Sequence, residues 1–126
     1  MPTPLRCYRD LVVWQKAMAL AVTCYQQTKM LPPSEMYGMT SQIRRAAASI
    51  PANIAEGNGR ETTGVYIHFL RIAQGSLKEL ETHVLLFEMV FLIKSENAEE
   101  MLAQCETIGK MLRALIRSLQ QKEASE

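Results

Sequence analysis

The side chains best suited to binding a ligand are arginines that flank one small, mostly apolar segment. Residues 41–60 read SQIRRAAASIPANIAEGNGR, with Arg44 and Arg45 adjacent and Arg60 at the end. Guanidinium groups suit phosphate, so these three residues are candidate nucleic-acid contacts, together with Lys16 and Arg71. Adjacent helical residues point about 100° apart, so Arg44 and Arg45 cannot both lie on one narrow helix face.

A structural role is the alternative for the same arginines, since one of them can pair with Glu35, Glu56 or an acidic group of another helix. The net charge is only +1, which gives no global basic field. Residues 1–60 nevertheless hold seven Lys and Arg against three Asp and Glu, and residues 61–126 hold seven against ten. This split predicts either a basic face or complementary charge between neighbouring helices or subunits. Interleaved aromatic residues for base stacking are missing, so sequence readout of single strands is not indicated.

The sequence contains no arrangement typical of a catalytic, metal or cofactor site. Glu79 and His83 are four residues apart and can touch, but the second Glu/His pair that a di-iron bundle needs is missing. Residues 57–60 read GNGR and lack the Lys-Ser/Thr ending of a phosphate-binding loop. No carboxylate pair or nucleophile signature is convincing. We therefore expect a non-enzymatic protein without a metal or cofactor.

Cysteine usage and hydropathy predict a cytoplasmic protein. The three cysteines, Cys7, Cys24 and Cys105, are odd in number and far apart, as expected of reduced thiols. No apolar run approaches the roughly 18 residues that span a bilayer. The first ten residues do not resemble a signal peptide.

Apolar residues recur at spacings of three and four in four segments, which predicts four amphipathic helices over about 8–30, 34–57, 62–93 and 97–120. The predicted inner stripes are, helix by helix: Leu11, Trp14, Met18, Ala21, Tyr25 and Thr28; Met36, Met39, Ile43, Ala47, Ile50 and Ile54; Phe69, Ala73, Ser76, Leu80, Val84, Phe87 and Phe91; Met101, Cys105, Ile108, Leu112, Leu115 and Leu119. The last seven residues have no apolar face and are expected to fray.

Local signals predict where the second helix begins, bends and ends. Ser34 follows two prolines and is a plausible N-cap. Pro51 lies inside the segment and predicts a kink or local loosening, because it cannot donate to the carbonyl of Ala47, but not a break, because the apolar spacing continues through it. Gly57 predicts a left-handed residue that closes the helix.

Short loops favour antiparallel neighbours, so the expected fold is all-α: an antiparallel up-down-up-down four-helix bundle. The chain is predicted to form one domain over residues 1–126, with ordered helices over about 8–120. Gly75 and Ser76 are small and are expected to let another helix approach closely.

Several blocks together resemble a bacterial four-helix-bundle family, the proteins encoded in intervening sequences of 23S ribosomal RNA genes. The blocks are DL at 10–11, VWQKA at 13–17, EMYGMTSQIRRA at 35–46, SIPANIAEG at 49–57, GR at 59–60 and AQGSLKELE at 73–81. The resemblance covers about residues 8–120. Accessory variability proteins of diversity-generating retroelements are related to this family.

The resemblance implies a ring-like homopentamer, and its retroelement relatives imply binding of RNA or DNA and of a reverse transcriptase. It also gives the small-residue segment a structural role within or between chains. Candidate residues for helix packing or oligomer contacts are Trp14, Ile50, Pro51, Asn53, Glu56, Gly75 and Ser76. Asn53 and Glu56 are expected either to satisfy polar groups left by Pro51 or to bridge subunits. We therefore expect a homo-oligomeric scaffold with nucleic acid as its ligand. The alternative is a protein-binding adaptor that binds no nucleic acid.

Overall fold

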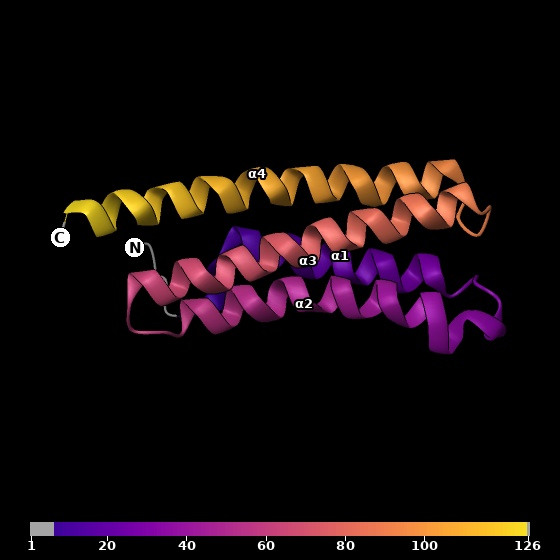
Figure 1. Ribbon diagram of the computed structural model, residues 1–126, viewed down its shortest axis with the longest axis horizontal. Coiled ribbons are helices and arrows are strands. Elements are labelled where there is room, and N and C mark those ends of the chain that lie inside the picture. Colours follow the sequence, from indigo (N-terminus) through magenta and orange to yellow (C-terminus); the bar gives the residue numbers. More distant parts are fainter. Residues whose placement is uncertain (1–6, 126) are drawn as a thin grey trace.

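The computed structural model describes residues 7–125, and these residues fold into four long helices (Figure 1). The α-helices are α1 (Val12–Thr28), α2 (Ser41–Asn58), α3 (Thr63–Met89) and α4 (Ser95–Ser125). Shorter helical turns precede α1 and α2: η1 (Tyr8–Asp10), η2 (Pro33–Glu35) and η3 (Met36–Thr40). No strand occurs within residues 7–125, so the all-α prediction is confirmed.

The connections between helices lie at the two ends of the molecule. In Figure 1 the α1–α2 and α3–α4 connections share one end, and the α2–α3 connection lies at the other. Two side-chain contacts show how α2 and α3 align: Ser49 touches Ser76, and Asn58 touches Tyr66, which lies earlier in α3. The C-terminal end of α4 extends beyond the α2–α3 connection (Figure 1).

The core is aliphatic, and all four helices contribute to it. On α2, α3 and α4 most of the predicted inner stripe is buried, including Ile43, Ile50, Leu80, Phe87 and Leu112. This burial supplies the main driving force for packing the helices, because each large aliphatic side chain contributes roughly 1.5–3 kcal/mol when it leaves water. Ile50 therefore belongs to the core of the protomer.

The inner stripe predicted for α1 is confirmed at Ala21 and Thr28, which are buried, but is wrong by about one residue in the rest of the helix. Of that stripe, Met18 and Tyr25 are exposed and Trp14 is half-buried, whereas Val13, Ala17, Leu20 and Cys24 are in the core. Both sets recur at spacings of three and four, so periodicity alone cannot choose between two adjacent apolar stripes. The structure places the smaller side chains at the centre and the large amphipathic ones at the edge.

The second predicted helix is interrupted near its start. Gly38 has φ −116° and ψ −107°, outside the helical region, and α2 begins only at Ser41. The hydroxyl of Ser41 donates to the carbonyl of Gly38 at 2.9 Å. Ser34 lies inside η2 and makes no N-cap hydrogen bond, so its predicted capping role is wrong. The α2 helix does continue through Pro51 without a break, as expected.

Gly57 does not close α2 through a left-handed conformation. The helix runs on to Asn58, and no glycine in the described part of the chain has positive φ. Gly57 is instead buried at a close contact between α2 and α3: a Cβ built on it would lie 2.8 Å from Cβ of Phe69 and 3.1 Å from the carbonyl oxygen of Tyr66. A side chain would therefore push the two helices apart.

The last two helices differ from their predicted bounds at three ends. The α3 helix ends at Met89, not near residue 93, and α4 begins at Ser95, two residues earlier than expected. The tail predicted to fray is helical as far as Ser125. Its Gln, Lys, Glu and Ala residues are strong helix formers, which explains helix formation without an apolar face.

Candidate functional site

Arg44 and Arg60 are held by contacts within the chain. The Nε–H of Arg44 donates to Oγ1 of Thr28 at 2.9 Å, and its guanidinium lies 4.7 Å from the centre of the Tyr25 ring. Arg60 forms an ion pair with Glu56 and lies over the Phe69 ring, 5.2 Å from its centre. Arg44 thus joins α2 to α1, and Arg60 joins the end of α2 to α3.

The other three predicted phosphate contacts are exposed but lie on three different helices. Lys16 is on α1, Arg45 on α2 and Arg71 on α3. Lys16 borders a small hollow between α1 and α4 that Gln104 also lines. The carbonyl oxygen Oε1 of the Gln104 side chain is buried without a hydrogen-bond partner.

A more concentrated basic surface lies on the last part of α4, outside the set of predicted phosphate contacts. Lys110, Arg113, Arg117 and Lys122 are exposed, and no acidic residue occurs between the first and the last of them. The earlier part of α4 is acidic, with Glu96, Glu99, Glu100 and Glu106. This polarity matches the helix dipole, which favours anions near the N-terminus and cations near the C-terminus. The spacing of these four cations was readable from the sequence.

The basic part of α4 faces a hollow shared with α3. Lys78 and Arg113 line it beside Gly75 and Gly109, and its volume is about 310 Å³. Nζ of Lys78 also pairs with Glu81 at 3.2 Å. A polyanion lying along this face would meet cations from both helices.

A hydrogen bond joins the small-residue segment to α3 at the predicted packing residue Ser76, through Ser49 of α2, and the predicted Asn53 supports it from within α2. The hydroxyls of Ser49 and Ser76 lie 2.7 Å apart, and Nδ2 of Asn53 donates to the carbonyl and hydroxyl oxygens of Ser49 at 2.8 and 3.0 Å. Asn53 therefore reinforces this contact and does not reach the carbonyl of Ala47 that Pro51 leaves without its usual donor. Glu56, in the last turn of α2, pairs with Arg60, which lies two residues beyond the end of that helix.

Gly75 is exposed, and a Cβ built on it would have no neighbour within 4 Å. The prediction that this glycine permits close helix approach is therefore wrong within the protomer. Gly57 has that function instead, and Ser76 takes part through its hydrogen bond.

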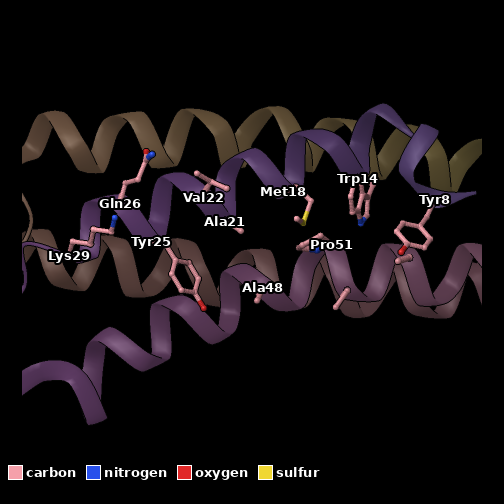
Figure 2. Close-up of a pocket in the computed structure, with 12 residues that line it drawn as sticks. Tyr8, Trp14, Met18, Ala21, Val22, Tyr25, Gln26, Lys29, Ala48 and Pro51 are labelled. Atoms are coloured by element: carbon pink, nitrogen blue, oxygen red, sulfur yellow. The ribbon is translucent and has the colours of Figure 1, made fainter.

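An open apolar groove runs between α1 and α2 (Figure 2). Its volume is about 700 Å³, and it is lined by Tyr8, Trp14, Met18, Ala21, Val22, Tyr25, Gln26, Lys29, Ala48, Pro51, Ala52 and Ala55. Figure 2 shows the large side chains coming from α1 and small ones facing them from α2. The rings of Tyr8 and Trp14 pack edge to face with their centres 5.2 Å apart. Two predicted interaction residues thus line the same open groove, Trp14 half-buried and Pro51 buried.

The titratable groups that could do chemistry include one Glu–His pair and two buried thiols. Nε2 of His83 lies 3.6 Å from Oε1 of Glu79, as their spacing predicted. Burial raises the pKa of the Cys24 and Cys105 thiols to about 12, whereas Cys7 is exposed. Among residues 7–125, no group of three or more His, Cys, Asp or Glu side chains is placed to hold a metal ion. Over the same stretch, no helix is both long and apolar enough to cross a membrane.

Comparison with known proteins identifies a family and a similar solved structure. The family model for 23S rRNA-intervening sequence proteins matches residues 9–114. The solved structure is a protein of unknown function from the S23 ribosomal protein family of Bacteroides thetaiotaomicron, 29% identical with a TM-score of 0.78. The alignment covers 83% of this chain and 98% of that one. No match was found among curated proteins.

Proposed function

Because this chain belongs to the family of 23S rRNA-intervening sequence proteins, we propose that it is a non-enzymatic, cytoplasmic scaffold that assembles as a homopentamer and binds structured RNA or DNA. The family name points to RNA but describes where genes of the family occur. The proposal therefore needs support from the surface of this chain.

We infer first that the helices form an up-down-up-down bundle. Contacts between α2 and α3 support this order, since Ser49 meets Ser76 whereas the later Asn58 meets the earlier Tyr66. Contacts between α3 and α4 support the same opposite direction. A Cβ built on Gly64, early in α3, would approach Glu123, late in α4, whereas a Cβ built on Gly109, earlier in α4, would approach Leu77, later in α3.

The observation that carries the nucleic-acid proposal is the basic end of α4. Its four cations between Lys110 and Lys122 have no acidic residue among them, and exposed Arg71 adds a cation on α3. Lys110 pairs with Glu106 and Lys78 with Glu81, so Arg113 and Arg117 are the central cations of this surface. Arginine binds phosphate through paired hydrogen bonds, and counterion release then favours association. Repetition around a ring raises the effective concentration of cations for a polyanion, so a chain with net charge +1 can still bind one.

The experiment that tests this proposal measures RNA affinity as a function of salt. We expect the affinity of the wild-type protein for a structured RNA to fall steeply between roughly 50 and 200 mM salt. The double change Arg113→Glu with Arg117→Glu is expected to lower affinity and to make the slope of log K against log salt shallower, by about 1 for each phosphate that is no longer bound. Lys94→Glu, just before the acidic start of α4, is the matched control and should change affinity little.

Binding that ignores salt, or that survives the double change, contradicts the nucleic-acid proposal. Salt-insensitive capture of one protein would then favour the adaptor function. By resemblance to accessory variability proteins, a reverse transcriptase is the protein partner to test first.

A further inference from the structure

Phe91 is placed unfavourably for an isolated protomer. Its side chain is 93% exposed, and its φ of 64° is the one positive value at a non-glycine residue within residues 7–125. The N–H of Leu92 donates to the carbonyl of Phe87 at 2.8 Å, and the N–H of Phe91 donates to that of Glu88 at 3.0 Å. This hydrogen-bond pattern closes helices and normally has glycine where Phe91 stands. Because the ring is almost fully exposed, residues 7–125 offset little of the cost of a bulky residue there, so the aromatic ring is best explained by a contact outside the protomer.

Phe91 belongs to a patch of exposed apolar side chains where α3 gives way to α4. We call this patch the tip; it comprises Leu85, Leu86, Met89, Val90 and Phe91. The surrounding segment is acidic, because residues 85–100 hold four glutamates against one lysine, a net charge of −3. A partner for the tip must therefore offer an apolar surface bordered by positive charge.

The groove between α1 and α2 has those two properties. Its floor and walls carry Trp14, Met18 and Tyr25, whose aromatic and thioether groups pack well against another aromatic ring. Residues 8–29 and 41–58, which build the groove, hold five Lys and Arg against two Asp and Glu, a net charge of +3. Tip and groove lie on different elements, so both are present and uncovered on every chain.

We propose that the tip of one copy of this chain docks in the α1–α2 groove of the next copy, with Phe91 as the inserted side chain. This inference rests on the proposed homo-oligomer and names the surfaces that form it. The contact is head-to-tail, because two different surfaces meet, and repeated head-to-tail contacts close into a ring when the rotation allows. Because the tip segment is negative and the groove is positive, electrostatic attraction favours docking of the tip in the groove of a second copy. Repulsion between two negative tips opposes tip-to-tip pairing.

The test uses variants that remove one surface at a time, with mass measured by multi-angle light scattering. Phe91→Gly removes the inserted ring at a position that glycine fits, and Phe91→Asn is a second variant that also tolerates left-handed backbone. Ala52→Glu places a negative charge at an exposed groove position. Each of these variants is expected to have the mass of one chain, 14.2 kDa. The matched control is Tyr37→Ser, which removes a side chain that is 97% exposed in η3 and should leave the wild-type mass unchanged.

Mixing the variants tests the head-to-tail geometry. Phe91→Gly keeps an intact groove and Ala52→Glu keeps an intact tip, so an equimolar mixture should form a complex of two chains although neither variant associates alone. Circular dichroism checks that each variant keeps the helical content of the wild type.

Either of two results overturns this inference alone. The first is that Phe91→Gly and Phe91→Asn both assemble like the wild type. The second is that the mixture of Phe91→Gly with Ala52→Glu stays monomeric. A monomeric wild type overturns the homo-oligomer itself, so the two failures are distinguishable.

Discussion

Replacing Gly57 and Gly75 by alanine gives a matched pair of perturbations within one molecule. Both glycines lie inside long helices, but Gly57 is buried against α3 whereas Gly75 is exposed with open space around it. Alanine raises helix propensity by about 1 kcal/mol at either position. The difference in the free energy of unfolding between the two variants cancels the gain in helix propensity and isolates the cost of the new methyl group at Gly57.

That cost follows from the contacts that the methyl group would make. It would lie 2.8 Å from Cβ of Phe69 and 3.1 Å from the carbonyl oxygen of Tyr66. Neither is the end of a flexible side chain, so relief requires α2 and α3 to move apart. Overpacking of this kind costs typically about 1–3 kcal/mol. We expect Gly57→Ala to be less stable than Gly75→Ala by about 2 kcal/mol, with Gly75→Ala above the wild type by up to about 1 kcal/mol.

Urea unfolding followed by circular dichroism at 222 nm measures both free energies. The measurement is made at protein concentrations where wild type and variants have the same mass, because association would stabilise them unequally. Equal stability of the two variants, or a Gly57→Ala variant above the wild type, would refute the claim that Gly57 allows close helix approach.

The remaining predictions use the same unfolding measurements together with thiol labelling. In a chain that already carries Ala52→Glu, which blocks the groove, Phe91→Gly should raise the free energy of unfolding by about 0.5–1 kcal/mol, because relief of left-handed strain exceeds the added unfolded-state entropy of glycine. A lower free energy of unfolding would contradict strain at this residue. Burial raises the pKa of Cys24 and Cys105 from 9.0 to about 12. Above pH 9 the unfolded chain loses these two protons while the folded protein keeps them, so the free energy of unfolding should fall as pH rises from 9.0 towards about 12. For the same reason, iodoacetamide at a pH of about 8 should label one exposed thiol near the N-terminus quickly and the two buried thiols only after unfolding, and mass spectrometry counts the labels. Ser49→Ala and Ser76→Ala should each cost about 1 kcal/mol and be non-additive in a double-mutant cycle, since they share one 2.7 Å contact; additive effects would show that the hydroxyls do not interact.

The four helices were predictable because their apolar spacing is long and regular. Ile43, Ile50, Leu80 and Leu112 are buried as the stripes required. The prediction failed on α1, where a second apolar stripe runs beside the first. Periodicity indicates that a helix has an apolar face, but only the packing of the four helices determines which of two adjacent stripes is buried in the core.

Local conformational signals were less reliable, because glycine has more than one use. The position of Gly57 after a long apolar pattern predicts a left-handed stop, yet this glycine permits two helices to touch. Gly38, which interrupts the start of the second helix, carried no distinguishing sequence signal. Conversely, the left-handed position at the end of α3 is occupied by Phe91, which apolar spacing assigns to the core.

The candidate site could be predicted only in part. Arginine chemistry identified Arg44 and Arg60, and the Arg60–Glu56 pair follows from a spacing of four residues, but the contacts with Tyr25 and Phe69 depend on tertiary structure. The α1–α2 groove likewise depends on side chains that are distant in sequence. The basic end of α4 could have been found from residue spacing, and it is the surface on which the nucleic-acid proposal now depends.

The most direct test of the proposed function is the mass of the purified protein by multi-angle light scattering, alone and with a structured RNA, at low and at physiological salt. We predict a mass of five chains of 14.2 kDa each that gains RNA at low salt and releases it as salt rises. A pentamer that never gains RNA would contradict nucleic-acid binding. A monomer would contradict the scaffold itself.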